Sequence, residues 1–187
     1  AHELSADAEI NLDDLPGAGR LDLLSRCVTS ALLCSHDIRE NVRVHLVVDG
    51  YLVSFDGETI RGLSPDERST AARIRDALAA HDEAIGSMAA EPSPGVSIRR
   101  GGLDSLLADL EANVVTLHAE GAPIVDLDSL SDPAFVLSDH REFTDVEADL
   151  LATRADERVS VGPTALHAAQ AITVANNFLD TGGYTDY

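Results

Sequence analysis

The sequence predicts an α/β fold in which a mainly parallel sheet carries helices on both faces. Short runs of β-branched and apolar residues are bounded by Gly, Pro or Asp, as buried strands are. Between them lie longer stretches whose apolar residues recur at helical spacing, so strands and helices alternate. Such alternation is typical of parallel sheets, because each crossover helix packs back onto the sheet. A chain of 187 residues can form one sizeable core, and we expect a single domain over residues 1–187.

The first half of the chain is expected to hold two helices and a few strands. After a polar lead-in over residues 1–11, periodicity predicts an amphipathic helix within residues 19–35 and a half-buried strand over residues 42–48. Ser64-Pro65-Asp66-Glu67 has the spacing of a capping box with Pro at the first helical position. The remaining expectations are a hairpin over residues 51–61 that turns near Asp56-Gly57, a helix from the capping box to about Ala80, a loop over 86–95 and a strand over 96–99.

The second half continues the alternation in shorter steps. Thr144 and Glu147 offer a second capping box for a short helix. The other expected elements are a helix over residues 103–110, strands over 114–117, 134–137 and 159–161, and an apolar-faced closing helix directly after Gly162-Pro163.

The junction at Gly162-Pro163 is a candidate ligand site. Backbone N–H groups at a helix start are unpaired, Gly162 allows close approach, and Pro163 stiffens the turn. A strand, Gly-Pro and helix in succession are most often an ordinary connection, so the junction alone indicates no specific ligand.

Charge composition indicates adaptation to salt. The formal net charge is -20, from 33 acidic and 13 basic residues, and every basic residue is Arg. Dense acidic charge keeps a surface hydrated, although a merely acidic mesophilic protein is the alternative. Acidity argues against nucleic acid, because phosphate contacts rely on positive charge. In molar salt, however, the Debye length is about 3 Å, so a local Arg cluster can still bind RNA.

Cysteine usage and hydropathy point to a cytoplasmic, soluble protein. Cys27 and Cys34 are about 10 Å apart along the predicted helix, too far for a disulfide, and both are expected to be reduced core residues. No apolar run of membrane-spanning length and no signal-like start is present, so we expect no membrane association.

Other motifs for cofactors and catalysis are incomplete. Gly17-Ala18-Gly19 lacks the third glycine and the preceding strand of a nucleotide-binding loop. His118, His140 and His167 lack zinc-ligand spacing, so no metal is expected. The residue order leaves a Ser-His-Asp triad open, but there is no nucleophile elbow.

Four separated motifs lie at residues 12–22, 63–68, 114–121 and 134–140. They resemble motifs of the archaeal tRNA pseudouridine-N1 methyltransferases, the TrmY family of the SPOUT superfamily, and the resemblance covers nearly the whole chain. It implies a C-terminal trefoil knot, a homodimer packed across the knot, S-adenosylmethionine as cofactor, and methylation of N1 of pseudouridine 54 in the T-loop of tRNA. The family usually opens with a core strand that we expect to be missing here, through truncation or because the fold tolerates its loss.

The resemblance also implies the residues that bind the cofactor, in three loops of the knot. These are Leu117, Ser138, Val161, Gly162, Pro163, Thr164, Ala165, Leu166 and Ala171. Ser138 stands where many relatives have Gly, and Ala171 where several have Cys. Without the family, Leu117 and Leu166 would be read as core packing.

We expect proton removal, with no covalent intermediate. N1 of pseudouridine is already a nitrogen, so it needs only to lose a proton while the cofactor sulfonium acts as the leaving group. The absence of a thiol at Ala171 is therefore tolerable. Asp139 is the candidate base and Asp14 the second, although either could instead cap a turn or pair with a cation.

Arginines are the candidates for RNA contact, since Arg forks match phosphates. Arg99 and Arg100 form the only adjacent basic pair, and three more Arg lie in or beside the motifs: Arg20, Arg26 and Arg68. The alternative for each is ion pairing with the abundant acids.

Three other functions remain open. The chain could be a SPOUT methyltransferase that acts on another RNA site, or a non-catalytic homologue that binds cofactor or RNA, as Ser138 and Ala171 would allow. It could also be an acidic α/β protein whose Arg residues only balance charge. A homodimer is expected because the closing helix carries more apolar surface than a small sheet edge would cover, and the family resemblance implies the same.

Overall fold

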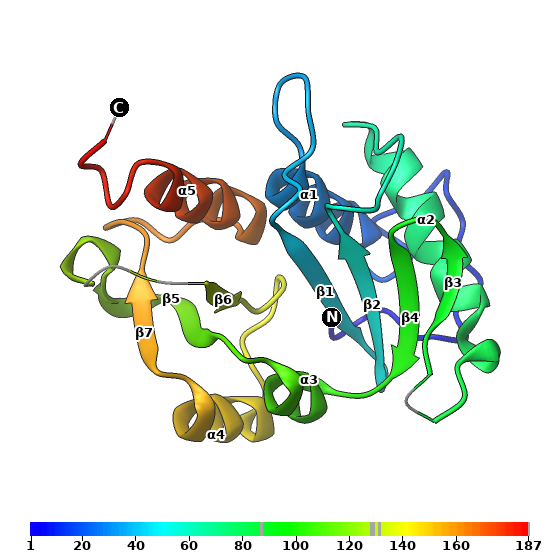
Figure 1. The fold of residues 1–187 in the computed structure, drawn as a ribbon. Coiled ribbons are helices and arrows are strands. Elements are labelled where there is room, and N and C mark those ends of the chain that lie inside the picture. The colour runs from blue at the N-terminus through cyan, green and yellow to red at the C-terminus, as the bar shows by residue number, and fades with distance from the viewer. Residues whose placement is uncertain (87, 128–129, 131, 187) are drawn as a thin grey trace. The chain divides into compact units, whose positions relative to one another are not determined.

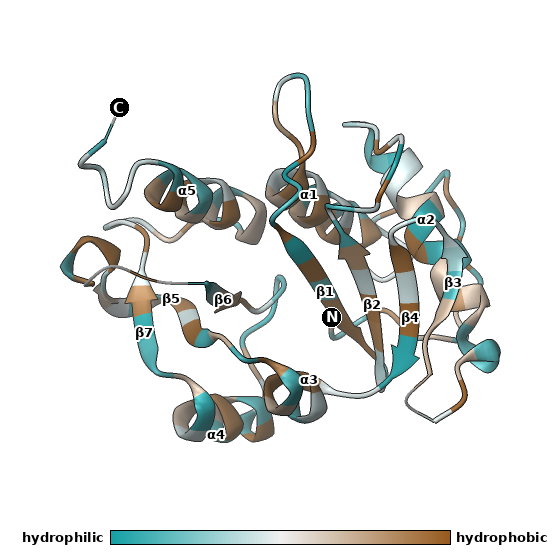
Figure 2. Ribbon diagram, in the orientation of Figure 1, coloured by the Kyte–Doolittle hydropathy of each residue, from teal (hydrophilic) through white to brown (hydrophobic). Residues whose placement is uncertain are grey.

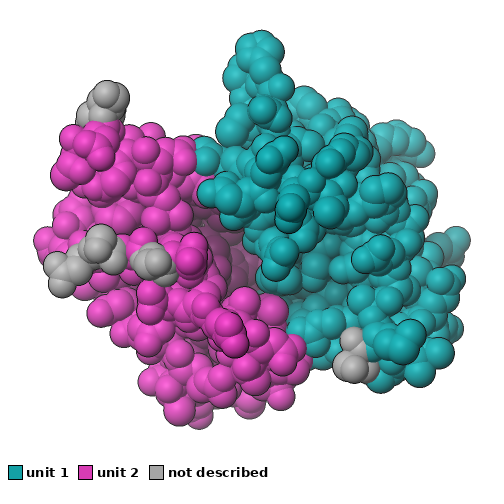
Figure 3. Space-filling view, viewed as in Figure 1, with its two compact units in different colours: residues 1–103 teal, residues 104–187 magenta. Residues whose placement is uncertain are grey.

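The computed structural model describes residues 1–86, 88–127, 130 and 132–186. The chain divides into two compact units, residues 1–103 and residues 104–187 (Figure 3). Both units combine helices with a sheet, which confirms the predicted α/β class.

The first unit is built on a four-stranded antiparallel sheet with strand order β1-β2-β4-β3 (Figure 1). Figure 2 shows β1, β2 and β4 as largely hydrophobic, and Phe55 and Ile98 are among the fully buried side chains. The prediction of a mainly parallel sheet is wrong for this unit, because short turns join β1 to β2 and β3 to β4, and β2 also pairs antiparallel with β4. Its elements are α1 (Leu21–Leu32), β1 (Arg43–Val48), β2 (Tyr51–Asp56), α2 (Glu67–Ala79), the short 3-10 helix η1 (His81–Glu83), β3 (Ala90–Ser93) and β4 (Val96–Arg100).

The hairpin of this unit turns at Asp49-Gly50 and not at Asp56-Gly57. Asp49 and Gly50 have φ values of 47° and 79°, the two positive values that a type I′ turn requires. Gly57 follows β2 and is buried, and a Cβ there would lie 1.9 Å from the carbonyl oxygen of Arg39. Both dipeptides are Asp-Gly, but only the first has alternating apolar residues on both sides.

Three further expectations for this unit need correction. The N-cap of α2 is Asp66, whose carboxylate accepts hydrogen bonds from the N–H groups of Arg68 and Ser69, so Ser64 and Pro65 precede the helix. The expected loop over residues 86–95 contains strand β3, where Pro92 is tolerated because β3 is an edge strand. Cys34 is exposed beyond the end of α1, so it is no core residue.

A buried carboxylate anchors the start of α1. Asp22 is only 6% exposed, and two arginines clamp it. The Nε and Nη2 atoms of Arg20 lie 3.0 and 3.1 Å from the two carboxylate oxygens, and Nη2 of Arg26 donates to Oδ2 at 2.5 Å. The hydrogen bond from Arg20, followed by the contribution of Arg26, lowers the pKa of Asp22 below its usual range, against the opposing effect of burial.

The second unit has a three-stranded parallel sheet with strand order β6-β5-β7 and helices on both faces (Figure 1). The predicted parallel sheet is therefore confirmed here. Its elements are α3 (Leu103–Asp109), β5 (Asn113–Pro123), the 3-10 helix η2 (Ile124–Asp126), β6 (Pro133–Val136), α4 (Asp145–Arg154), β7 (Glu157–Ser160) and α5 (Ala168–Asp180). The capping box of Thr144 and Glu147 at the start of α4 is present as predicted.

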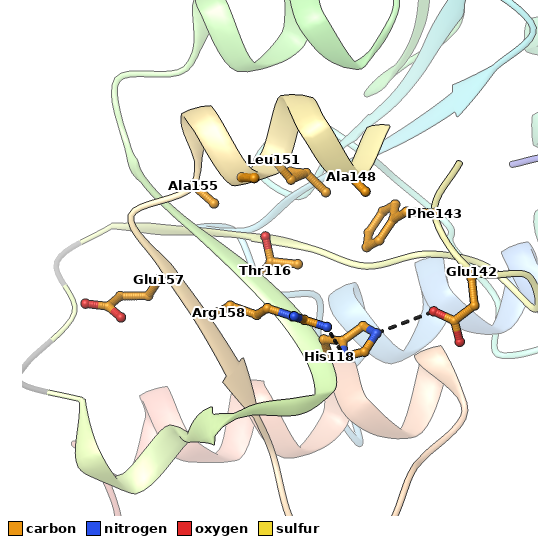
Figure 4. Close-up of a pocket in the computed structure, with 10 residues that line it drawn as sticks. Thr116, His118, Glu142, Phe143, Ala148, Leu151, Ala155, Glu157 and Arg158 are labelled. Atoms are coloured by element: carbon orange, nitrogen blue, oxygen red, sulfur yellow. Dashed lines mark hydrogen bonds and ion pairs between the residues drawn. The ribbon is translucent and has the colours of Figure 1, made fainter. Parts of the chain in front are cut away.

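The two faces of this sheet differ in chemistry. Val115, Leu117 and Val159 point to the α5 side, where they pack with Ala175 and Phe178 in one hydrophobic cluster. Because side chains alternate along a strand, Thr116, His118 and Arg158 point to the opposite face, which α4 covers (Figure 4).

A bulge interrupts the pairing of β5 with β7. Leu117 and Ala122 both pair with Val159, so residues 118–121 leave the ladder. A Cβ at Gly121 would lie 2.4 to 2.6 Å from the backbone atoms of Val159. Only glycine therefore allows β5 to rejoin its neighbour after the bulge.

None of the described helices has the length and apolar character that a membrane crossing requires. Within the same described residues, no group of three or more His, Cys, Asp or Glu side chains is arranged to hold a metal ion.

Replacing Gly121 by Ala should destabilise the second unit, because the added methyl group collides with the β7 backbone. We expect the free energy of unfolding to fall by about 1–3 kcal/mol, the usual cost of overpacking. Gly162→Ala is the matched control, since nothing lies within 4 Å of a Cβ there and its φ is not positive. Equal stability of the two variants in chemical denaturation would contradict this account of the bulge.

Replacing Asp22 by Asn should remove a stability contribution that depends on pH. Because the folded pKa of Asp22 is lowered, the contribution is complete above the unfolded value of about 3.9 and is lost as pH falls through the folded value. We expect a loss of about 1–2 kcal/mol at neutral pH that shrinks below about pH 4, measured by denaturation in molar potassium chloride. The control Asp76→Asn, which breaks an exposed pair with Arg75, should have almost no effect at either pH.

Candidate functional site

The parallel sheet of the second unit gathers three segments at one edge. Thr116 pairs with Val136 and Leu117 pairs with Val159, so the carboxyl ends of the three strands lie side by side. The bulge of β5, the segment after β6 and residues 161–167 after β7 all begin there. Ligands of α/β proteins commonly bind outside the carboxyl ends of parallel strands.

The closing helix starts later than predicted. It begins at Ala168 with His167 as N-cap, and the side chain of Gln170 accepts a hydrogen bond from the His167 N–H group at 3.2 Å. Gly162 and Pro163 therefore lie in a connecting loop, and the expectation that they open the helix is wrong. Apolar residues at helical spacing begin at Ala165 and Leu166, which is why the helix was predicted to start there. In the structure these residues still belong to the segment that connects β7 to α5.

The predicted cofactor residues all lie in the second unit, and the structure brings some of them together. Leu117 is 7% exposed within the hydrophobic cluster, and Leu137 and Val161 pack against that cluster. Ala171 is also buried, one turn before Ala175 in α5. Four others are exposed along the connecting loop: Pro163, Thr164, Ala165 and Leu166. Gly162 stands between the two groups, with open space beside it.

The segment after β6 forms a compact turn around the candidate base. The Asp139 side chain is 8% exposed, and its Oδ1 accepts a hydrogen bond from the Arg141 N–H group at 2.8 Å. The same oxygen lies 3.6 Å from Nδ1 of His140, and the Ser138 hydroxyl donates to the carbonyl of Arg141. The carboxylate thus has the turn-capping role that was the alternative, and this turn also fixes its position at the sheet edge.

The five predicted RNA-binding arginines lie in the first unit, and each of them interacts with other groups of the protein. Arg20 and Arg26 clamp Asp22, and Nε of Arg26 also lies 3.3 Å from Glu67. Nη1 of Arg68 pairs with Asp13 at 2.5 Å. These ion pairs agree with the alternative that the arginines balance the acidic charge. For Arg20, Arg26 or Arg68 to bind a phosphate, the existing ion pair with a carboxylate must first break.

Arg100 and Arg99 end the antiparallel strand β4. The guanidinium of Arg100 lies 5.3 Å from the centre of the Tyr51 ring, and its Nε donates to the carbonyl of Ala84 at 3.3 Å. Arg99 pairs across the strands with Leu52 and is half-buried. The second candidate base, Asp14, lies in the same unit and accepts a hydrogen bond from the Gly17 N–H group.

A pocket of about 340 Å³ lies on the α4 face of the parallel sheet, and sequence reasoning missed it (Figure 4). None of the predicted cofactor residues lines it. The signal that could have revealed it is the alternation in β5 and β7, which turns polar side chains toward a helix. Its lining residues are Thr116, His118, Glu142, Phe143, Ala148, Leu151, Ala152, Ala155, Glu157 and Arg158.

A polar network crosses one wall of this pocket. Nδ1 of His118 lies 2.7 Å from Nη2 of Arg158 and 3.1 Å from the N–H group of Glu120. Both partners are donors, so Nδ1 is the acceptor and the ring proton sits on Nε2. Nε2 in turn lies 3.4 Å from a carboxylate oxygen of Glu142 (Figure 4). The network orients the imidazole between an arginine and a glutamate.

The comparisons with known proteins agree along the whole chain. Residues 1–184 match the family model described as "Putative SAM-dependent RNA methyltransferase". Curated tRNA (pseudouridine(54)-N(1))-methyltransferases of Natronomonas pharaonis and Haloferax volcanii are each 57% identical over 190 residues, which cover 100% of this chain and 96% of each relative. The protein of the same name from Methanopyrus kandleri is 35% identical and covers 100% of this chain and 92% of that relative.

A solved structure shows the same fold at low identity. It is the crystal structure of Archaeoglobus fulgidus Nep1 bound to S-adenosylhomocysteine, with a TM-score of 0.62 and 14% identity over 87% of this chain and 70% of that chain. The family match and the relatives that cover the whole chain lead to one assignment. The chain belongs to the family of SAM-dependent RNA methyltransferases, and within it to the archaeal tRNA (pseudouridine(54)-N(1))-methyltransferases.

Proposed function

We propose that this protein transfers the methyl group of S-adenosylmethionine to N1 of pseudouridine 54 in the T-loop of tRNA. The observation that carries the proposal is the 57% identity, over the entire chain, to curated relatives named for that reaction. A site at the edge formed by three parallel strand ends in the second unit is supported by the usual position of ligands in α/β proteins.

The loops at this edge suit the cofactor. Leu117, Leu137 and Val161 provide an apolar wall of the kind that an adenine ring needs, and the open space at Gly162 admits a group close to the backbone. The exposed stretch 163–166 offers backbone donors and acceptors. When bound, S-adenosylmethionine supplies a methyl group on a positively charged sulfur. Its binding residues would be Leu117, Ser138, Val161, Gly162, Pro163, Thr164, Ala165, Leu166 and Ala171.

The protein's own task is to position the pseudouridine ring and to accept the proton from its N1 atom. Asp139 is our candidate for the acceptor, because its carboxylate is held in place at the same edge by the Arg141 N–H group. No thiol is required, since the attacking atom is already a nitrogen, and Ala171 is compatible with that route.

Further properties follow from this proposal. Residues 1–187 would act as one methyltransferase, with the chain around α5 forming the trefoil knot of the SPOUT fold; the likeness to Nep1 supports this topology. A homodimer is supported by Leu166 and Leu179, which stay 39% and 38% exposed beside and on α5. The site of action would be the cytoplasm, where tRNA is modified, and no metal would take part.

The proposal is tested by methyl transfer from labelled S-adenosylmethionine in high potassium chloride. The acceptors are tRNA transcripts with and without pseudouridine in the T-loop. We expect label only in the pseudouridine-bearing tRNA. Equal labelling of both transcripts would point to another RNA site, and binding of cofactor without any transfer would point to a non-catalytic homologue.

Replacing Asp139 by Asn should slow catalysis without weakening cofactor binding. Asn keeps an oxygen that can accept from the Arg141 N–H group but cannot take a proton, so kcat should fall by roughly 100-fold or more. Asp149→Asn is the control with an equal change of charge, because Asp149 lies at an exposed position of α4. If Asp139→Asn retains the wild-type kcat, the proton goes elsewhere, and Asp14→Asn becomes the variant to measure.

Replacing Arg68 by Gln should weaken tRNA binding while leaving the affinity for S-adenosylmethionine unchanged. If Arg68 contacts one phosphate, the slope of log affinity against log salt should fall by about one. Arg75→Gln is the control on the same helix, since Arg75 also pairs with a neighbouring aspartate. Identical tRNA affinities and salt slopes for the two variants would remove Arg68 from the RNA-binding surface.

A further inference from the structure

The pocket beneath α4 contains a buried polar group without a partner. Thr116 is 5% exposed, and among the described residues its hydroxyl has no hydrogen-bond partner. In Figure 4 this hydroxyl points away from the sheet, toward Leu151 of α4, so it faces into the pocket. Buried hydroxyl groups are normally hydrogen-bonded, so the Thr116 hydroxyl can hydrogen-bond to a group that enters the pocket.

The pocket has one apolar wall and one polar wall. The apolar wall is formed by Ala148, Leu151, Ala152 and Ala155 of α4 together with the ring of Phe143. On the polar wall, the contacts of Arg158 to His118 and Glu120 use only its Nη2 atom, which leaves Nε and Nη1 able to donate. Glu142 provides an acceptor on the same side. A flat ring with both carbonyl and N–H groups would satisfy both walls.

The charge of the pocket disfavours an anion. Glu142 and Glu157 both line it, against the guanidinium of Arg158. A phosphate would meet a net negative wall, whereas an uncharged heterocycle would not. The volume of about 340 Å³ lies at the low end for ligand sites, which suits a single base or nucleoside.

We propose that this pocket binds a base of the RNA substrate, turned out of its stack, against the apolar wall formed by Phe143 and α4. Aromatic side chains and hydrogen-bonding groups aimed at the base edge are the usual means by which proteins hold unstacked RNA bases. Thr116 and Arg158 donate to the carbonyl groups of the base, and Glu142 accepts from its N–H group. The inference rests on the proposed RNA methylation, and it adds a recognition site on the opposite sheet face from the hydrophobic cluster that contains Leu117.

The decisive variant is Thr116→Val, which removes the hydroxyl and keeps the side-chain shape. A buried hydroxyl without a hydrogen-bond partner in the free protein does not stabilise the fold. The free energy of unfolding of the variant should therefore be at least that of the wild type. Its affinity for tRNA should fall about tenfold, the loss of one hydrogen bond, while its affinity for S-adenosylmethionine stays unchanged. Thr70→Val is the matched control, because Thr70 in α2 also carries a buried, unpartnered hydroxyl but lies in the first unit.

A second variant tests the stacking wall. Phe143→Ala should lower tRNA affinity by tenfold or more, because stacking on an aromatic ring is lost. The wild type should also bind free uridine, measured by NMR titration, and should not bind inorganic phosphate at the same concentration. Thr116→Val and Phe143→Ala should both weaken uridine binding, which would show that free nucleoside and RNA base use one pocket.

Three results would overturn the inference. They are unchanged tRNA affinity in both Thr116→Val and Phe143→Ala, phosphate binding in place of uridine binding, and an equal loss of affinity in Thr70→Val. Methyl transfer by the wild type is recorded in parallel. If transfer to pseudouridine-bearing tRNA succeeds while the variants bind tRNA normally, the pocket assignment fails and the proposed function stands.

Discussion

The pairing of β5 with strands on both of its sides is the constraint on which the second unit depends. Its parallel register with β6 and β7 brings three strand ends to one edge, and its alternation divides the sheet into an apolar face and a polar face. Gly121 allows β5 to bulge and then return to β7. The proposed cofactor loops, the candidate base and the α4 pocket all take their positions from this one strand.

The division into two faces separates two kinds of recognition. On the α5 side, Leu117 and its neighbours are closely packed, which suits a wall for a cofactor but leaves few polar groups. On the α4 side, Thr116 is buried while Arg158 is exposed at the pocket, so polar groups there can hydrogen-bond to a base edge.

Local signals in the sequence were sufficient for elements that stand alone. Helix α1, strand β1 and the capping box at Thr144 follow from periodicity and side-chain chemistry within a few residues. The antiparallel sheet was missed because the hairpin turn was assigned to Asp56-Gly57. The turn at Asp49-Gly50 is the one that pairs β1 with β2. The late start of α5 was missed because apolar spacing does not reveal the length of the segment that connects β7 to the helix. The cofactor residues came from family resemblance, and the pocket required knowledge of which strand face α4 covers.

The most direct test of this account is a crystal structure of the protein with S-adenosylhomocysteine, grown in high salt. The account predicts the ligand at the carboxyl edge of the parallel sheet, in contact with Leu117, Ser138 and the loop 161–166, with the pocket beneath α4 left to solvent. Density for S-adenosylhomocysteine in the pocket beneath α4, against Phe143, would contradict both the cofactor site and the base pocket. That result would require the two roles to be reassigned.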